Sequence, residues 1–230
     1  MQNLLTDARR IGVVIPAHNE AQSIGALVQK VLERVPLVVV VDDGSLDKSG
    51  EIARENGAEV IRHKICLGKG AALRTGFSFL LEAGCEAVIT MDGDGQHLPE
   101  DIDKFLRAWQ IHPGTDIFVG TRKIAGTQMP IIRKITNLAM SLLISLIAIQ
   151  YIPDTQNGFR LIRKNVLASI PTTASHFDME TELLIRASWH GFRIRPVPVM
   201  TVYSKEHSKV RPIQDTLRFF KMLFLLFLPR

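Results

Sequence analysis

The chain has 230 residues, of which 46% are apolar and 22% charged. That length can bury the core of one domain, and this composition, without repeats or low-complexity runs, excludes a disordered chain and a solenoid. Residues 1–115 carry 12 Lys and Arg against 16 Asp and Glu, a net −4, whereas residues 116–230 carry 16 against 7, a net +9. We expect the basic half to meet an anionic lipid surface or a phosphorylated substrate, and nucleic acid is disfavoured because no zinc spacing, aromatic RNA motif or helix-turn-helix pattern accompanies the charge.

The first half of the sequence alternates short apolar runs with amphipathic segments. We expect strands over 11–15, 37–41, 59–62, 87–91 and 116–120, and helices over 21–34, 48–56 and 68–83. Pro16 is expected to stop the first strand. The alternation predicts an α/β fold with a mostly parallel sheet covered by helices on both faces, and ligands then bind past the carboxyl ends of the strands.

The most informative stretch follows the strand expected at 87–91. Asp92 and Asp94 are separated by one glycine, and Gln96 adds a neutral oxygen at the same spacing. Residues two apart on an extended tip can reach one hard cation, and Mg²⁺ or Mn²⁺ would take these ligands and complete its shell with diphosphate oxygens and water. The alternative to a metal site is a simple turn, because Asp and Gly are common turn residues. A calcium loop of the EF-hand type fails because its sixth position is His97, where glycine is needed, and its twelfth is Asp103, where glutamate is expected.

Other polar residues follow the neighbouring strands. Asn19-Glu20 and Asp42-Asp43 lie at the carboxyl ends of expected strands. The simplest interpretation is that they share one cleft with the metal residues. Asp42-Asp43 could instead cap a helix across the Asp-Gly-Ser turn. The Gly68-Lys69-Gly70 segment is a weak phosphate-loop candidate, and a plain helix start is favoured for it.

The second half is less regular. An apolar helix is expected over 135–152, too short for the ~20 residues of a membrane span and therefore buried or interfacial. A polar turn over 154–160 precedes a helix over 177–190 and a strand over 193–202 interrupted by prolines. Of Glu180 and Glu182, which do not share a helical face, only one should reach the site. The apolar helix within 212–230 suits a membrane interface, or else docking on the core or in a dimer.

Two cysteines and the start of the chain bear on location. Cys66 and Cys85 are far apart and in no metal spacing, so we interpret them as reduced packing residues. The chain begins without a signal-peptide pattern. Together these observations predict a cytoplasmic protein.

Six motifs in order resemble those of family 2 glycosyltransferases, in particular the branch of dolichyl-phosphate mannosyltransferase and polyprenyl-phosphate glucosyltransferases. They are Pro16-Ala17-His18-Asn19-Glu20, Val41-Asp42-Asp43-Gly44-Ser45, Gly68-Lys69-Gly70-Ala71-Ala72, Met91-Asp92-Gly93-Asp94-Gly95-Gln96-His97, Gly120-Thr121-Arg122 and Asn157-Gly158-Phe159-Arg160. The resemblance implies a GT-A-type, Rossmann-like domain over 1–211, with a nucleotide-sugar half (11–121) and an acceptor half (122–211), followed by a C-terminal helix over 212–230.

The resemblance also implies residue roles. The nucleotide sugar would be bound by Pro16, Ala17, Asn19, Glu20, Asp42, Asp43, Lys69 and Asp92, and the metal by Asp92, Asp94 and Gln96. It implies inverting transfer of a hexose from a GDP- or UDP-sugar to a polyprenyl phosphate, dolichyl or undecaprenyl, by an enzyme lying peripherally on the cytoplasmic face of a membrane. A homo-oligomer or a membrane-protein partner is compatible with this reading.

The acceptor chemistry follows from charge. A phosphate acceptor is already ionised near neutral pH and needs positioning more than a base, so Arg122, Arg133 and Arg160 are expected to grip it while Asp94 serves the leaving group. If the acceptor were a soluble glycan or small hydroxyl compound, Asp154 or Glu180 would have to act as base. A nucleotide-sugar-binding protein without turnover is the remaining alternative.

Overall fold

One seven-stranded sheet organises the molecule in the computed structural model. The structure describes residues 10–122, 131–200 and 212–227. In the second range side chains are described from residue 134, and in the third from residue 217. The strands are β1 (Ile11–Ala17), β2 (Leu37–Asp42), β3 (Glu59–Arg62), β4 (Ala87–Thr90), β5 (Ile117–Arg122), β6 (Arg160–Arg163) and β7 (Ile194–Val199). Their order is β3-β2-β1-β4-β6-β5-β7. β6 runs antiparallel to β4 and β5, and the other pairs are parallel. The predicted mostly parallel sheet is confirmed.

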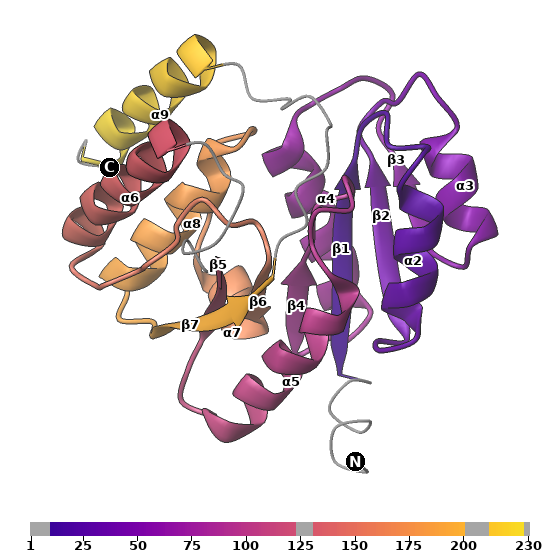
Figure 1. The fold of residues 1–230 in the computed structure, drawn as a ribbon, viewed down its shortest axis with the longest axis horizontal. Coiled ribbons are helices and arrows are strands. Elements are labelled where there is room, and N and C mark those ends of the chain that lie inside the picture. Colours follow the sequence, from indigo (N-terminus) through magenta and orange to yellow (C-terminus); the bar gives the residue numbers. More distant parts are fainter. Residues whose placement is uncertain (1–9, 123–130, 201–211, 228–230) are drawn as a thin grey trace.

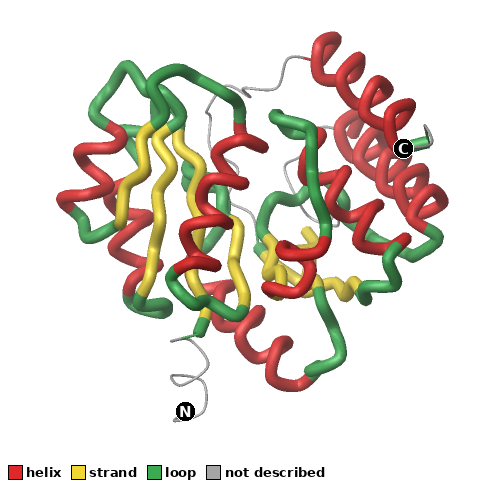
Figure 2. The backbone as a smooth tube through the Cα atoms, turned by 180° about the vertical axis from the view of Figure 1, so that it is seen from behind, coloured by secondary structure: helices red, strands yellow, loops and turns green. Residues whose placement is uncertain are grey.

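Helices cover both faces of this sheet, as predicted (Figures 1 and 2). They are α2 (Ile24–Leu32), α3 (Ser49–Glu55), α4 (Lys69–Glu82), α5 (Ile102–Ile111) after the 3-10 turn η1 (Pro99–Asp101), α6 (Ile131–Ala148), α7 (Lys164–Ser169), α8 (Asp178–Trp189) and α9 (Pro212–Leu226). Successive strand residues alternate between the faces. Val13 and Ile15 of β1 therefore pack with α2, α3 and α5, whereas Val14 packs with α4, α7 and α8.

Proline does not end the strands where the sequence suggested it would. β1 continues through Pro16 to Ala17, paired with β2, because the ladder between β1 and β4 ends at Val14 and the strand has a partner on only one side there. β7 likewise runs through Pro196 and Pro198. It lies at the edge of the sheet, where a missing N–H donor is tolerated.

Two elements were not anticipated. The expected turn ends at residue 160 and no element is expected over 161–176, but residues 160–163 form β6 between β4 and β5, and α7 follows directly. The segment is only four residues long and has an arginine at each end, so it lacks the continuous apolar run of the other central strands. A short polar-ended strand of this kind is identified only by its neighbours in the sheet.

The C-terminal helix is docked on the domain. α9 contributes Phe219 and Met222 to a third apolar cluster with Ile144 of α6 and Ile185 of α8. α6 itself begins and ends four residues earlier than predicted, and the chain turns after it at Ile149, where φ is +54°. Within the described ranges, no helix combines the length and apolar character needed to cross a membrane.

Candidate functional site

The loops after β1 and β2 are tied together at the carboxyl edge of the sheet. The backbone N–H of Asn19 donates to Ser45 Oγ at 3.0 Å, and Asn19 Oδ1 accepts from the N–H of Leu46 at 2.8 Å. The N–H of Glu20 donates to Ser49 Oγ at 2.7 Å. Asn19 has a φ of +56°, which asparagine tolerates better than most residues. The structure thus brings the motif beginning at Pro16 and Ala17 against the Asp-Gly-Ser turn, as the shared-site prediction requires.

Asp42 supports this turn from beneath. Its side chain is fully buried, and Oδ1 accepts a hydrogen bond from the N–H of Ser45 at 2.9 Å. Arg62 Nε lies 3.4 Å from Oδ2. Asp42 has no exposed surface and holds the turn, which differs from the expected contact with the nucleotide sugar. It does not cap a helix either, because the N-cap residue of α3 is Lys48, without a side-chain capping hydrogen bond.

Asp43 is also committed to the protein. Its carboxylate accepts hydrogen bonds from His63 Nδ1 at 2.7 Å and from the backbone N–H groups of Leu67 at 2.9 Å and Gly68 at 2.7 Å. Burial alone would raise the pKa of Asp43, but these hydrogen bonds hold it below its usual value. Asp43 is 3% exposed and therefore organises the segment leading to Lys69, which differs from the expected contact with a base or ribose.

The loop after β4 gathers the predicted metal ligands. The N–H of Gln96 donates to Asp94 Oδ1 at 2.9 Å, and Ser23 Oγ donates to the carbonyl of Gly93 at 2.6 Å, which joins this loop to the start of α2. Burial, followed by the negative charge of Asp92, raises the pKa of Asp94. Two carboxylates that repel each other in this way are suited to a divalent cation.

The donor set fits such a cation. Among the described residues, no three His, Cys, Asp or Glu side chains are grouped to hold a metal. Two carboxylates and one amide oxygen are a typical protein contribution to an Mg²⁺ or Mn²⁺ site, where substrate oxygens and water complete the coordination. Asp92, Asp94 and Gln96, all partly exposed, are the residues that would hold it.

Lys69 links this loop to the second half of the chain. Its Nζ lies 2.6 Å from Asp92 Oδ1 and 2.7 Å from Glu180 Oε2 of α8. Burial would lower the pKa of Lys69, but the two carboxylates raise it overall. Burial would likewise raise the pKa of Asp92, but Lys69, together with His97 and Arg160, lowers it overall. Glu182 instead accepts a hydrogen bond from Arg186 Nε at 2.8 Å, so one of the two glutamates reaches the site, as predicted.

The backbone at Gly158 makes room for that contact. A Cβ atom built at Gly158 would lie 2.8 Å from Lys69 Nζ and 3.0 Å from Asp92 Oδ2. The carbonyl of Gly158 accepts a hydrogen bond from Thr90 Oγ1 at 2.6 Å, which fixes the turn before β6 against the end of β4. A side chain at this position would therefore displace the end of Lys69 from its contact with Asp92.

The three arginines predicted to bind the acceptor phosphate differ in their surroundings. Arg122 makes a bidentate pair with Asp154, both hydrogen bonds being 2.8 Å long, and its side chain is 17% exposed. Arg160 is 2% exposed, and its guanidinium donates to the carbonyls of Asn157, Glu180 and Thr155. The prediction that Arg160 grips the acceptor is therefore corrected, because those bonds tie it to the turn and to α8. The side chain of Arg133 lies outside the described residues.

Sequence reasoning missed two histidines at the site. His63 joins Asp43 to Thr75, with Nε2 3.0 Å from Thr75 Oγ1. His97 is the last residue of the Met91–His97 motif but has no expected role at the site, yet it is buried beside the metal ligands and stacks on Phe159 with ring centroids 5.0 Å apart. Its position directly after Gln96 was the signal that could have identified it.

Comparisons with known proteins identify relatives of this chain. A family model described as "Glycosyl transferase family 2" matches residues 12–174. UDP-N-acetylglucosamine--dolichyl-phosphate N-acetylglucosaminyltransferase of Methanococcus voltae is 30% identical over 224 residues, covering 87% of this chain and 88% of the relative. Undecaprenyl-phosphate mannosyltransferase of Micrococcus luteus is 30% identical over 206 residues, covering 84% of each.

A solved structure shares the fold. Glucosyl-3-phosphoglycerate synthase of Mycobacterium tuberculosis, in complex with Mn²⁺, UDP and phosphoglyceric acid, matches with a TM-score of 0.77 at 19% identity, over 100% of this chain and 83% of that one. Another structure of that synthase, in complex with Mg²⁺ and UDP, also has a TM-score of 0.77, at 20% identity over 97% of this chain and 82% of that one.

Proposed function

Because the chain belongs to glycosyl transferase family 2, we propose that it transfers a hexose, with inversion, from a UDP- or GDP-sugar to a polyprenyl phosphate, using Mg²⁺ or Mn²⁺. The observation that carries this proposal is the meeting of Asp92, Asp94 and Lys69 at the carboxyl edge of the sheet. The names of two relatives, which include dolichyl-phosphate and undecaprenyl-phosphate acceptors, support the choice of acceptor.

The donor side must stabilise a leaving nucleoside diphosphate. A divalent ion on Asp92, Asp94 and Gln96 would supply charge for that group when bound. Lys69 adds a fixed ammonium, because its bonds to Asp92 and Glu180 hold it beside the metal loop. The loop from Pro16 to Glu20 is held by hydrogen bonds to the loop after β2 and offers an ordered surface for the nucleotide. This order reduces the entropy lost on binding.

The acceptor side favours a phosphate over a hydroxyl. The two carboxylates that could serve as base are both held in ion pairs, Asp154 with Arg122 and Glu180 with Lys69. A phosphate oxygen is already ionised near neutral pH and attacks without a base. Arg122, held by Asp154 at the end of β5, is the described arginine that we propose orients it.

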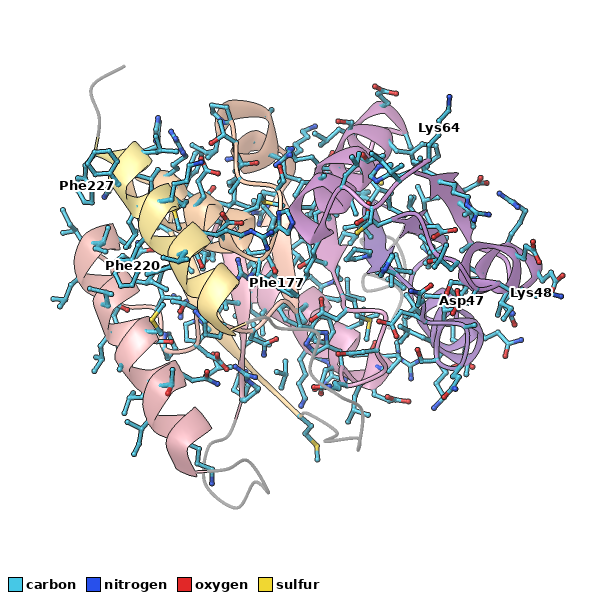
Figure 3. The ribbon with its side chains drawn as sticks, turned by 90° about the horizontal axis from the view of Figure 1, so that it is seen from above. Asp47, Lys48, Lys64, Phe177, Phe220 and Phe227 are labelled. Carbon is cyan, nitrogen blue, oxygen red and sulfur yellow. The ribbon has the colours of Figure 1, made fainter. Side chains whose placement is uncertain are left out.

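We further propose that transfer takes place at the cytoplasmic face of a membrane, with α6 and α9 against the lipid. These helices and the residues after them expose the large apolar side chains of Ile135, Leu138, Leu142, Leu143, Leu146, Ile149, Tyr151, Leu217, Phe220, Phe224, Leu225 and Phe227. We name this set the α6–α9 face. Phe220 and Phe227 of this face lie at one end of the molecule. The charged residues Asp47, Lys48 and Lys64 lie at the opposite end (Figure 3).

The charge of the α6–α9 face supports lipid as its occupant. Residues 131–153 and 216–230 contain no Asp or Glu, whereas their sequence includes Arg133, Lys134, Arg218, Lys221 and Arg230. Basic residues beside an apolar helix face are attracted to anionic headgroups, whereas two such faces from two copies of the chain would repel each other. A helix that lies in the plane of the headgroups can contact lipid without crossing the membrane.

A transfer assay tests the proposed function. The full chain is incubated with radiolabelled UDP- and GDP-sugars, Mn²⁺ and either undecaprenyl phosphate, undecaprenol or 3-phosphoglycerate in detergent. We expect labelled lipid only from the polyprenyl phosphate, and only with metal. Label on 3-phosphoglycerate or undecaprenol would instead indicate a soluble or hydroxyl acceptor. Donor binding without transfer to any acceptor would indicate a nucleotide-sugar-binding protein.

Vesicle flotation tests the membrane proposal separately. Leu146 and Phe224 are 77% and 66% exposed, so Leu146→Glu with Phe224→Glu should leave the fold intact and reduce binding to phosphatidylglycerol vesicles. Ile111→Glu, at a 69% exposed apolar residue at the end of α5, is the matched control and should bind like wild type. Equal flotation of all three proteins would refute the lipid contact.

A further inference from the structure

His97 has a hydrogen bond that determines where its proton lies. Its Nδ1 is 3.2 Å from the backbone nitrogen of Asp92, and the backbone N–H is the donor. Nδ1 must therefore be an unprotonated acceptor. The neutral imidazole then carries its single proton on Nε2, which makes Nε2 a hydrogen-bond donor.

Packing fixes the ring in this orientation. His97 is 6% exposed and stacks on Phe159 at an interplanar angle of 27°. Phe159 is fully buried and packs in turn on Phe105 of α5, with ring centroids 4.6 Å apart. Because Phe159 follows Gly158, the turn that contacts Lys69 and Asp92 also sets the position of the His97 ring.

The Nε2 atom is available to a ligand. Within the described part of the chain it has no hydrogen-bond partner, and it is not among the fully buried polar atoms that lack one. The charged groups whose fields reach the ring are Asp92, Asp94, Lys69 and Arg122. The ring is therefore close enough to the metal-loop carboxylates, and to the two cations that we assign to donor and acceptor, to be influenced by all four charges.

We propose that His97 is a further substrate-contacting residue, whose Nε2–H donates a hydrogen bond to a diphosphate oxygen of the nucleotide sugar while Nδ1 fixes the backbone of Asp92. This inference rests on the proposed function, since it requires a diphosphate at the metal loop. A neutral donor suits this place because it adds a directional contact without adding a third positive charge beside Lys69 and the metal. The ring thereby couples the shape of the metal loop to the bound phosphate.

Two isosteric substitutions separate the two roles. In His97→Asn, the amide oxygen replaces Nδ1 and can still accept from the N–H of Asp92, but nothing replaces Nε2–H. In His97→Gln, the amide nitrogen reaches the position of Nε2 and can donate to the ligand, but the acceptor for Asp92 is lost. Titration calorimetry with Mn²⁺ and either UDP or GDP measures ligand binding, and thermal unfolding without ligand measures the integrity of the loop.

We expect His97→Asn to bind the preferred nucleoside diphosphate roughly 10-fold to 100-fold more weakly than wild type, because a hydrogen bond to a charged oxygen is lost. His97→Gln should retain tighter binding than His97→Asn while unfolding at a lower temperature. Nitrogen-15 NMR of the wild type should show the Nε2–H tautomer, and its proton should move downfield when the diphosphate binds.

The outcomes distinguish this inference from the proposed function. Binding by His97→Asn as tight as in wild type, or a resting Nδ1–H tautomer, would overturn the role of His97 and leave the glycosyltransferase proposal standing. A wild-type protein that binds neither UDP nor GDP with Mn²⁺ would overturn both.

Discussion

The two halves of the molecule use the same kinds of charged residue in different ways. At the donor edge, Asp42 and Asp43 are buried supports for turns, whereas Asp92 and Asp94 are partly exposed on a loop that projects beyond the sheet. In the acceptor half, Arg160 is a buried support, whereas Arg122 remains partly exposed at the end of β5. In each half, one motif therefore supplies a buried scaffold residue, and a different motif supplies the more exposed residue that we propose faces the ligand. Burial distinguishes the two.

The largest expected effect is at the acids that we propose bind the metal. Asp94→Asn keeps the shape of the side chain but removes one charged metal ligand, so the rate of sugar transfer should fall by roughly 100-fold or more and Mn²⁺-dependent nucleotide binding should weaken. Asp103→Asn, at an exposed acid on α5, is the control and should match wild type in both assays. Turnover by Asp94→Asn at the wild-type rate would remove Asp94 from the metal site.

The corrected role of Arg160 predicts a loss of stability. Arg160→Lys keeps the charge, but one ammonium cannot reach three carbonyls in different directions, so we expect a loss of about 2 kcal/mol, or roughly 4–8 °C in Tm. Arg195→Lys, at an exposed position of β7, should leave Tm unchanged. If Arg160→Lys kept the wild-type Tm and raised only the KM for the acceptor, Arg160 would bind the acceptor phosphate, as the sequence analysis expected.

A smaller effect is expected where the halves meet. Gly158→Ala places a Cβ against Lys69 Nζ and Asp92, which should displace the lysine and weaken donor binding by roughly tenfold with little change in Tm. At Gly114, the nearest atom to an added Cβ is 3.8 Å away, so Gly114→Ala is the matched control. Unchanged calorimetric affinity in Gly158→Ala would show that the contact between the halves does not shape the donor site.

The smallest effect concerns Asp43 and depends on pH. Hydrogen bonds lower the pKa of folded Asp43, so its contribution to stability is complete above the unfolded value of about 3.9 and is lost as pH falls below it. Asp43→Asn should lower Tm by roughly 2–4 °C at pH 7, and the difference should shrink at pH 3. A difference that is the same at both pH values would mean that the charge of Asp43 is not involved.

Much of the sheet was predictable because its central strands are continuous apolar runs. Leu37–Asp42 and Glu59–Arg62 lie within one residue of the expected bounds, and Lys69–Glu82 begins beside the predicted glycine. The antiparallel β6 was not predictable, because its identity depends on pairing with β4 and β5. The pattern likewise could not show that edge positions allow a strand to pass through Pro196 and Pro198.

At the site, the chain positions of the polar residues were predictable but their burial was not. The loops bearing Asn19, Asp43 and Asp92 do meet at one edge, because parallel strands present their carboxyl ends together. Sequence spacing cannot show that Arg160 turns inward to three carbonyls, or that Glu180 rather than Glu182 reaches Lys69. These choices depend on α8, which lies far along the chain from the metal loop.

The division of work between the halves is tested most directly by initial rates of Arg122→Lys in detergent, with nucleotide sugar and polyprenyl phosphate both varied. Lysine keeps the charge but lacks the planar fork, so we expect a raised KM for the acceptor, an unchanged KM for the donor and a loss of Tm smaller than that of Arg160→Lys, because one of the two hydrogen bonds to Asp154 is lost. Arg195→Lys serves as the matched control. Wild-type kinetics for the acceptor, or an equal rise in both KM values, would contradict the assignment of the lipid phosphate to Arg122.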